Sequence, residues 1–233
     1  MKLSVVIPVY NERDTVEEVL KRVSAVEIPK EIIVVDDGST DGTGEKLETL
    51  KSRYSMEVLR NPVNRGKGAS VRLGFLSSTG DVVIIQDADL ELDPNEYGRL
   101  MEPIRQGRAE VVYGTRFSKG VRSEWNPAFV ANKVLTHLTN FLYGTNLTDM
   151  ETCYKVLKKN VLEALRLEAS GFDIEPEITA KIARGGFKIC EVPVSYKPRT
   201  SKEGKKIKWR DGLRAVWALF KYRVQPARKC LNL

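Results

Sequence analysis

The sequence predicts an α/β fold: a mostly parallel, Rossmann-like sheet flanked by helices, with an amphipathic helix near the C-terminus. In the first half, short runs rich in Val and Ile alternate with segments whose apolar residues recur at helical spacing. These runs are apolar on both faces, as expected for strands of a parallel sheet that helices cover on both sides. Right-handed crossovers between such strands produce a doubly wound sheet.

The elements of the first half follow one another in strand–helix order. Strands are expected at 4–9, 32–35, 56–59, 82–85 and 111–114. The first helix is expected to follow a cap at Asn11 and to place Val16, Val19, Leu20 and Val23 on one face. Further helices are expected at 44–53, 67–76 and 95–106.

The second half is less regular. Its pattern predicts helices at 128–142, 161–165 and 177–184 and a strand at 188–195. Segment 207–222 is amphipathic, with one face formed by Trp209, Leu213, Val216, Trp217 and Phe220. Without a repeat or a low-complexity linker, the simplest partition is one domain at 1–206, followed by a basic, amphipathic helix and tail at 207–233 that suits a membrane interface.

Composition excludes several classes of protein. The three cysteines form no CxxC pair and there is one histidine, so neither a zinc site nor a disulfide framework is expected. The N-terminus does not resemble a signal peptide and no apolar stretch is long enough to span a membrane, so a cytoplasmic location is expected.

The net charge of +7 is concentrated near the C-terminus. Residues 197–229 contain twelve Lys and Arg but two Asp and Glu, a local charge of +10 that leaves −3 for the rest. Such a block favours an anionic partner: phosphate, lipid headgroups or nucleic acid. A basic tail that only aids solubility is the alternative.

Polar and acidic residues follow the predicted strands. Pro8, Tyr10 and Glu12 come at the end of the first strand and Asp37 after the second. Asp87-Ala88-Asp89-Leu90-Glu91 follows the strand at 82–85. Because ligands of such sheets bind at the carboxyl ends of the strands, these residues predict a binding site.

Asp87-Ala88-Asp89 is the strongest candidate for chemistry. Mg²⁺ and Mn²⁺ prefer oxygen ligands and are commonly held by one or two carboxylates together with phosphate oxygens of the substrate. Such an ion offsets the charge that develops on a leaving diphosphate. An Asp-x-Asp alone is weak evidence, because most are loop or capping residues. Its position after a buried strand strengthens the prediction.

Other motifs point away from common alternatives. Segment 37–48 matches an EF-hand loop superficially, but a buried strand precedes it. Asn64-Arg65-Gly66-Lys67-Gly68 opens a helix and could approach a phosphate, but it lacks the Walker ending. No GxGxxG follows the first strand, which disfavours a dinucleotide oxidoreductase.

Taken together, the motifs resemble family 2 glycosyltransferases of the GT-A fold. The resemblance rests on VVIPVYNE, IIVVDDGSTDGT, NRGKGAS, DADLE and YGTRF, in this order. TDMETCYKVLKK, EPEITAKIAR and EVPVSYKPRTSKEGKKIKW extend it over most of the chain. Within the family the sequence is most similar to the dolichyl-phosphate mannose synthase group, which glycosylates polyprenyl phosphates.

The resemblance implies roles for individual residues. The nucleotide-sugar pocket would contain Pro8, Tyr10, Glu12, Asp37, Lys67, Asp87 and Ala88, with Arg65 nearby. The catalytic residues would be Asp87, Asp89 and Arg116. Asp87 would position the sugar or ribose, and Asp89 would ligate the metal, Mg²⁺ or Mn²⁺. Glu91 would join the metal shell; related sequences commonly carry Gln there.

The acceptor side follows from phosphate chemistry. A lipid monophosphate has a second pKa of about 6 and is largely dianionic near neutral pH, so it needs no strong base. Cationic side chains would hold it in line with the donor. Arg116, Lys133 and Arg199 are the candidates, and Asp149 and Glu177 match acidic positions of the family.

The predicted function is inverting transfer of mannose or glucose from GDP-mannose or UDP-glucose to dolichyl or undecaprenyl phosphate. The enzyme would bind peripherally to the cytoplasmic membrane face, with a possible membrane-protein partner and no nucleic acid. One alternative is transfer to a sugar hydroxyl of a cell-surface glycan, with Asp149 as the base. Another is a catalytically silent nucleotide-binding or RNA-binding protein, which the intact DADLE disfavours.

Overall fold

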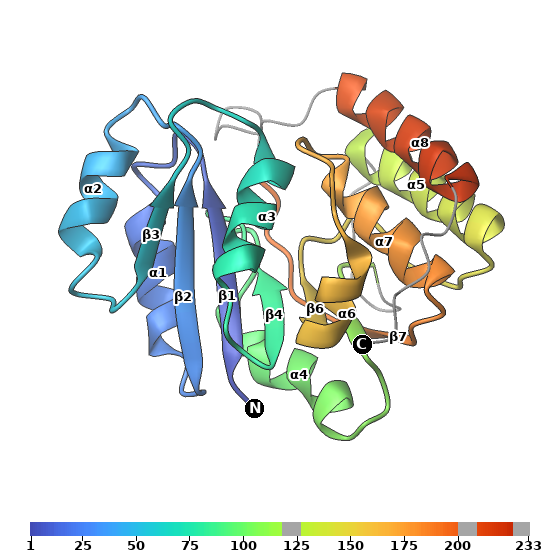
Figure 1. The fold of residues 1–233 in the computed structure, drawn as a ribbon, viewed down its shortest axis with the longest axis horizontal. Coiled ribbons are helices and arrows are strands. Elements are labelled where there is room, and N and C mark those ends of the chain that lie inside the picture. The colour runs from blue at the N-terminus through green and yellow to red at the C-terminus, as the bar shows by residue number, and fades with distance from the viewer. Residues whose placement is uncertain (118–126, 200–208, 226–233) are drawn as a thin grey trace.

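The structure is a computed structural model that describes residues 1–117, 127–199 and 209–225. Within these residues, seven strands form one sheet in the order β3-β2-β1-β4-β6-β5-β7 (Figure 1). The strands are β1 (Leu3–Val9), β2 (Lys30–Asp36), β3 (Glu57–Arg60), β4 (Val82–Ile85), β5 (Val111–Thr115), β6 (Lys155–Lys158) and β7 (Ile189–Pro193).

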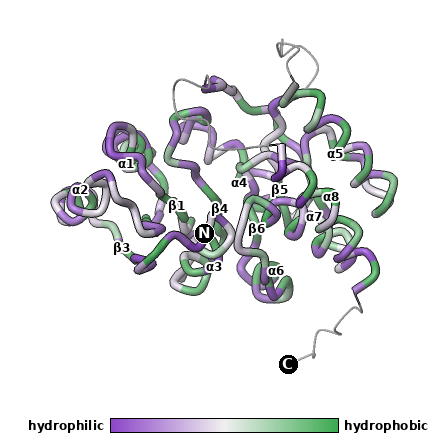
Figure 2. The backbone as a smooth tube through the Cα atoms, turned by 90° about the horizontal axis from the view of Figure 1, so that it is seen from above, coloured by the Kyte–Doolittle hydropathy of each residue, from purple (hydrophilic) through white to green (hydrophobic). Residues whose placement is uncertain are grey.

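Helices cover both faces of this sheet, as the apolar strands predicted. They are α1 (Val16–Ala25), α2 (Thr43–Leu50), α3 (Lys67–Ser77), the 3₁₀ turn η1 (Pro94–Glu96), α4 (Tyr97–Arg105), α5 (Pro127–Tyr143), α6 (Lys159–Leu165), α7 (Ile174–Arg184) and α8 (Trp209–Val224). Seen from above, α1 and α4 lie on one face and α3 and α6 on the other (Figure 2). Most strand residues are buried on both faces, so the sheet is the centre of the core.

One strand was not predicted from the sequence. β6 lies between β4 and β5 and is antiparallel to both, whereas the other neighbouring strands run parallel. Its apolar signal is only Val156 and Leu157 between lysines, too short to indicate a strand by periodicity. Because β6 is antiparallel, its first residue lies where β4 and β5 end. Segment 149–154, which precedes β6, therefore lies at the edge of the sheet where the parallel strands end.

The expected cap at Asn11 is wrong. α1 begins at Val16, and Asn11 adopts a left-handed conformation with φ 50°. Its side-chain oxygen instead accepts a hydrogen bond from the Thr40 backbone N–H at 2.9 Å. Asn11 therefore joins the loop after β1 to the loop after β2.

The amphipathic helix α8 packs on the domain with one face and exposes apolar side chains on another. Ala215, Ala218, Leu219 and Tyr222 are buried against α5 and α7. The exposed apolar side chains of α8 are Trp209, Leu213, Trp217, Phe220 and Val224. The neighbouring helix α5 exposes Val130, Val134 and Phe141. None of the helices that the structure describes is sufficiently long and apolar to cross a bilayer.

Candidate functional site

The predicted site residues gather at the edge of the sheet where the parallel strands end. β1 and β4 run parallel and adjacent, so Tyr10 and Asp87 follow neighbouring strands. Asp37 follows β2, and Arg116 follows β5. Pro8 and Tyr10 are half-buried at the end of β1, and Ala88 is buried.

Asp37 shapes the loop that precedes α3. Its buried carboxylate accepts hydrogen bonds from the Asn61 side chain at 2.8 Å and from the backbone N–H groups of Arg65 and Gly66 at 3.0 and 2.8 Å. Gly38 lies so close to Val63 that a Cβ at this position would meet backbone atoms at 2.6 Å. The loop expected to contact a nucleoside is thus held in place by Asp37.

The start of α3 does not offer an open anion site. The backbone N–H groups of Gly68 and Ala69 donate to the carbonyls of Gly171 and Ser170 at 3.2 and 3.1 Å. These two backbone N–H groups are therefore not available to a phosphate, and the suggestion that this helix end approaches one stays a prediction. The side chain of Lys67 nevertheless reaches the site.

Lys67 pairs with the first aspartate of DADLE. Its Nζ lies 2.8 Å from Asp87 Oδ1 and 3.3 Å from Glu175 Oε1. Burial disfavours both charges, but the pairing raises the pKa of Lys67 and lowers the pKa of Asp87. Both groups are therefore ionised near neutral pH.

The second aspartate lies in an opposite environment. Burial, together with the negative charges of Asp87 and Glu91, raises the pKa of Asp89 to about 7. The intervening Leu90 has φ 64°, and Asp89 Oδ1 accepts the Glu91 N–H at 3.1 Å, which folds the turn tightly. The two aspartates of one motif thus differ: Lys67 neutralises Asp87, whereas burial and the charges of Asp87 and Glu91 outweigh the effect of Arg199 on Asp89.

Arg199 contacts three carboxylates that were predicted to bind the nucleotide-sugar or its metal, which we call the donor side of the site. Its guanidinium contacts Glu12 Oε2 at 3.2 Å and Asp89 Oδ2 at 3.3 Å. Its backbone N–H donates to Glu91 Oε1 at 2.8 Å. The acceptor role expected for Arg199 stays a prediction, but the structure places this side chain next to Asp89, and it shows Glu12 paired with Arg199.

The carboxylates of Glu12, Asp89 and Glu91 suit a hard divalent cation. They supply oxygen ligands, and burial together with the negative charges of Asp87 and Glu91 raises the pKa of Asp89, an effect that a cation would offset. Among the described residues, no three acidic, His or Cys side chains form a complete metal-holding group. Mg²⁺ commonly takes only one or two carboxylates and completes its shell with substrate phosphates, so the residues fit such an ion.

Arg116 forms a buried, bidentate ion pair with Asp149. The distances are 2.7 Å from Nε to Oδ2 and 2.8 Å from Nη2 to Oδ1, and the Arg116 backbone N–H also donates to Oδ2 at 3.0 Å. Despite burial, the guanidinium holds the pKa of Asp149 below its usual range. Asp149 is fully buried and accepts hydrogen bonds from Arg116 and Asn132, which disfavours the alternative that it acts as a general base.

Lys133 lies close to Arg116, because both side chains contact the ring of Phe117. Its Nζ is 4.6 Å from the centre of the Phe117 ring and donates to the Thr148 carbonyl at 3.0 Å. The Arg116 guanidinium stacks over Phe117 and Tyr196 at 5.3 and 5.1 Å. Two of the three predicted acceptor cations are thus neighbours, whereas Arg199 lies on the donor side.

Sequence reasoning missed three charged residues of the site: Glu175 and Lys155, which are buried, and Glu151, which is half-buried. Glu175 bridges Lys67 and Lys155, whose Nζ lies 2.5 Å from Glu175 Oε2. Glu151 lies at the same strand ends. All three lie in the motifs TDMETCYK and EPEITAKIAR, but the acidic residue expected to act in the second motif was Glu177. Glu177 instead accepts the backbone N–H groups of Glu168 and Ala169 at 2.9 and 2.8 Å, so it stabilises a loop.

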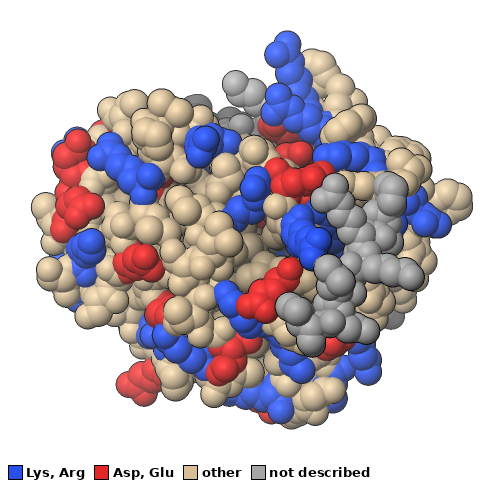
Figure 3. Space-filling view, viewed as in Figure 1, with Lys and Arg blue, Asp and Glu red and all other residues tan. Residues whose placement is uncertain are grey.

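Charges of both signs border the hollow in the face shown in Figure 3.

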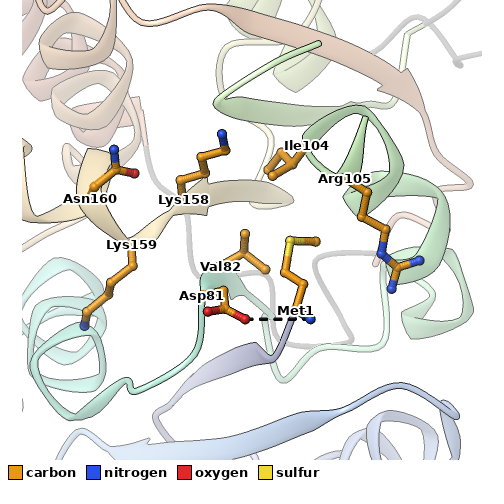
Figure 4. A pocket seen from close by; sticks show the side chains of 8 residues that line it. All are labelled: Met1, Asp81, Val82, Ile104, Arg105, Lys158, Lys159 and Asn160. Atoms are coloured by element: carbon orange, nitrogen blue, oxygen red, sulfur yellow. Dashed lines mark ion pairs between the residues drawn. The ribbon is translucent and has the colours of Figure 1, made fainter. Parts of the chain in front are cut away.

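A separate cavity of about 490 Å³ lies at the opposite edge of the sheet, where an ion pair joins the N-terminal amine to Asp81 at 3.8 Å (Figure 4). It is lined by Met1, Asp81, Val82, Ile104, Arg105, Lys158, Lys159 and Asn160. None of these is a predicted site residue, so this cavity is not the candidate active site.

Comparison with known proteins places the chain among sugar-transferring enzymes. The model of the family described as Glycosyl transferase family 2 matches residues 4–166. The chain is 34% identical over 215 residues to a dolichol-phosphate mannosyltransferase of Pyrococcus furiosus; the match covers 88% of this chain but 59% of that protein. It is 31% identical to a polyprenol monophosphomannose synthase of Mycolicibacterium smegmatis, over 84% of this chain and 77% of the relative.

A third relative and a solved structure agree with this result. An undecaprenyl-phosphate mannosyltransferase of Micrococcus luteus is 30% identical, over 88% of this chain and 87% of the relative. Glucosyl-3-phosphoglycerate synthase of Mycobacterium tuberculosis, solved with Mn²⁺, UDP and glucosyl-3-phosphoglycerate, superposes with a TM-score of 0.73 at 22% identity, covering 97% of this chain and 81% of that one. The structural similarity confirms the predicted GT-A type of α/β fold.

Proposed function

The chain belongs to glycosyl transferase family 2, and from this premise we propose that it transfers a hexose, mannose or glucose, from a nucleotide-sugar to a polyprenyl phosphate with inversion. The named relatives support this acceptor class, since all three act on a polyprenol or its phosphate. The donor is GDP-mannose or UDP-glucose.

The observation that carries the proposal is the arrangement of charges at two nearby strand ends. The carboxylates of Asp87, Asp89 and Glu91 follow β4, and the guanidinium of Arg116 follows β5. One antiparallel strand, β6, separates them. A donor diphosphate with its cation at the first position and an acceptor phosphate at the second can therefore meet across this gap.

In the proposed reaction, an oxygen of the acceptor phosphate attacks the anomeric carbon. The bond from that carbon to the nucleoside diphosphate breaks, and its electron pair leaves with the diphosphate oxygen. Arg116 holds the nucleophile: a guanidinium has five N–H groups, so it can bind Asp149 along one edge and a phosphate along another. Lys133 adds positive charge beside it, and Asp37 keeps the nucleoside loop in place.

Asp89 and Glu91 would hold Mg²⁺ or Mn²⁺. The Mycobacterium tuberculosis structure contains Mn²⁺ with UDP, which supports a divalent ion in this fold. When bound, such an ion neutralises charge on the leaving diphosphate. Asp87 cannot contribute its charge fully, because Lys67 already neutralises it.

The exposed apolar residues of α5 and α8 support peripheral binding to the cytoplasmic face of a membrane. We call Trp209, Leu213, Trp217, Phe220 and Val224 on α8, with Val130, Val134 and Phe141 on α5, the α5–α8 apolar surface. Arg210, Arg214 and Arg223 are exposed on the same helix α8. Aromatic and aliphatic groups flanked by arginines suit the interface of an anionic bilayer, where the lipid acceptor resides.

A transfer assay tests the function. The protein is incubated with radiolabelled GDP-mannose or UDP-glucose, Mg²⁺ and polyprenyl phosphate, and the lipid is extracted. Label in the lipid with one donor is expected, and the donor that is used identifies the sugar. No labelled lipid with either donor contradicts the proposed acceptor.

Vesicle sedimentation tests the membrane surface. The double variant Leu213→Ser/Trp217→Ser is expected to bind vesicles that contain phosphatidylglycerol about tenfold more weakly or worse, because two exposed apolar side chains that would insert into the bilayer are lost. Leu76→Ser is the matched control, since Leu76 is 84% exposed on α3 and outside this surface. Equal loss in both variants contradicts a role specific to α8.

A further inference from the structure

Glu151 is a carboxyl group at the centre of the candidate site to which the proposed reaction assigns no task. The segment that carries it crosses from the end of β5 to the end of β4. Thr152 Oγ1 donates to the Gly114 carbonyl at 2.6 Å, and Cys153 Sγ donates to the Ile85 carbonyl at 3.4 Å. Glu151 therefore belongs to a segment that contacts both β4, the strand before DADLE, and β5, the strand before Arg116.

The surroundings of Glu151 confirm this central position. Lys155, Glu175, Arg116 and Asp149 all lie close enough to Glu151 to influence its charge. Glu175 in turn contacts Lys67, the partner of Asp87. The Glu151 carboxyl thus lies close to Arg116 and Asp149 and to Glu175, the partner of Lys67, near the gap across which the proposed reaction would transfer the sugar.

One oxygen of this carboxyl is buried without a partner. Across the described residues, Glu151 Oε1 accepts no hydrogen bond, and the carboxyl forms no ion pair. The neighbouring carboxylates differ in their ion pairs. Asp149 is paired with Arg116, and Glu175, whose Oε1 also accepts no hydrogen bond, is paired with Lys67 and Lys155. Buried polar atoms are rarely left unpaired, so an unpaired oxygen in a site points to a ligand.

We propose that Glu151 is a sugar-positioning residue whose carboxyl hydrogen-bonds to hydroxyl groups of the transferred hexose. This inference rests on the proposed function and names the contact that would orient the sugar. A hydroxyl both donates and accepts, so either form of the carboxyl can bind it. A phosphate, by contrast, repels the ionised form, so the two phosphate groups of the reaction are poor ligands for Glu151.

The acid–base properties of the group agree with this assignment. Burial raises the pKa of Glu151 to about 7; Lys155 and Arg116 lower it, whereas Glu175 and Asp149 raise it. Near neutral pH, both forms of the carboxyl are therefore populated, and a hydroxyl ligand accommodates both.

Binding without the acceptor tests the proposal. The affinities of wild type, Glu151→Ala and Glu151→Gln are measured by calorimetry with Mn²⁺ for GDP, UDP, GDP-mannose and UDP-glucose. Glu151→Ala is expected to keep the affinity for the nucleoside diphosphate but to bind the matching nucleotide-sugar about tenfold more weakly or worse. Glu151→Gln should recover part of the loss, because an amide still hydrogen-bonds to hydroxyls.

Deoxy donors sharpen the test, and a surface variant controls it. Among donors that each lack one hexose hydroxyl, one is expected to bind wild type and Glu151→Ala equally, because the contact is already missing. Glu163→Ala, which removes an exposed carboxylate on α6, should leave every affinity unchanged.

Four results would overturn the proposal. Equal loss of nucleoside diphosphate and nucleotide-sugar affinity in Glu151→Ala indicates a structural role instead. Unchanged binding with loss of transfer at saturating donor indicates proton transfer from the acceptor. If the wild type binds neither nucleotide-sugar, the proposed function fails and this inference fails with it, whereas wild-type binding with no effect of Glu151→Ala overturns the inference alone.

Discussion

Carboxylates lie at both edges of the sheet, and Glu31 at one edge differs in its surroundings from Asp89 and Glu151 at the other. At the edge where β1 and β2 begin, Glu31 accepts hydrogen bonds from Lys2 Nζ and Ser4 Oγ, each at 2.5 Å, and from the Thr79 N–H at 2.6 Å. At the edge where the strands end, Asp89 faces other carboxylates, and Glu151 Oε1 has no hydrogen-bond partner among the described residues.

The pKa values show the same difference. Burial raises the pKa of a carboxyl group, but the hydrogen bonds from Lys2, Ser4 and Thr79 lower that of Glu31 to about 2. The pKa values of Asp89 and Glu151 instead rise to about 7. A carboxylate whose partners are all within the protein stabilises the fold, whereas one that lacks them is ready for a ligand.

Asp89→Asn should give the largest effect. Transfer is expected to fall about 10³-fold or more, because the metal loses a charged ligand. Stability in the absence of metal should stay equal or rise, since the neutral amide removes repulsion from Asp87 and Glu91. Transfer rates and urea unfolding without metal measure both. Wild-type activity in this variant refutes the metal role.

Asp149→Asn tests a satisfied carboxylate at the same edge as Asp89. It leaves Arg116 buried without its counter-charge, so the free energy of unfolding is expected to fall by about 3 kcal/mol. Urea denaturation measures the change. A double variant, Arg116→Met/Asp149→Leu, should recover most of that stability but not activity. A loss in Asp149→Asn below about 1 kcal/mol would show that the pair contributes little to the fold.

Glu31→Gln tests the opposite edge. At pH 7 the free energy of unfolding should fall by about 1–2 kcal/mol, a value discounted because the side chain is partly exposed. The folded pKa lies below the unfolded one, so this stabilisation is present above about pH 4.5 and is lost as pH falls toward 2. Urea denaturation at pH 7 and pH 3 measures it.

Transfer activity provides the control for Glu31→Gln. Activity at 25 °C is expected to match the wild type, because Glu31 lies at the far edge from the site. A large loss of activity in a folded Glu31→Gln protein would break the distinction between the two edges.

Asp81→Asn should give the smallest effect. Asp81 lies at the same edge as Glu31, but its side chain is 65% exposed and 3.8 Å from the N-terminal amine. Exposed ion pairs contribute little, so the change in unfolding free energy should stay within about 0.5 kcal/mol. Thermal unfolding measured beside Glu31→Gln checks the ranking. A larger loss than in Glu31→Gln would show that exposure does not separate the two.

The sequence by itself determined the fold class and the edge that carries the site. Runs of Val and Ile buried on both faces are a local signal of parallel strands, and parallel strands bring their carboxyl ends together. The DADLE motif and Arg116 could therefore be placed at one edge without coordinates, and the amphipathic helix α8 was also predicted.

Only the tertiary structure decided how the charges pair. The Arg199 side chain hydrogen-bonds to Glu12, which is 187 positions away in the sequence, and to Asp89, which is 110 positions away. The placement of Glu151 depends on β6, whose short apolar run gives no strand signal and which pairs antiparallel with both β4 and β5. Local periodicity determines which residues form strands, whereas the partner of a side chain depends on contacts between distant segments, and those partners distinguish Glu31 from Asp89 and Glu151.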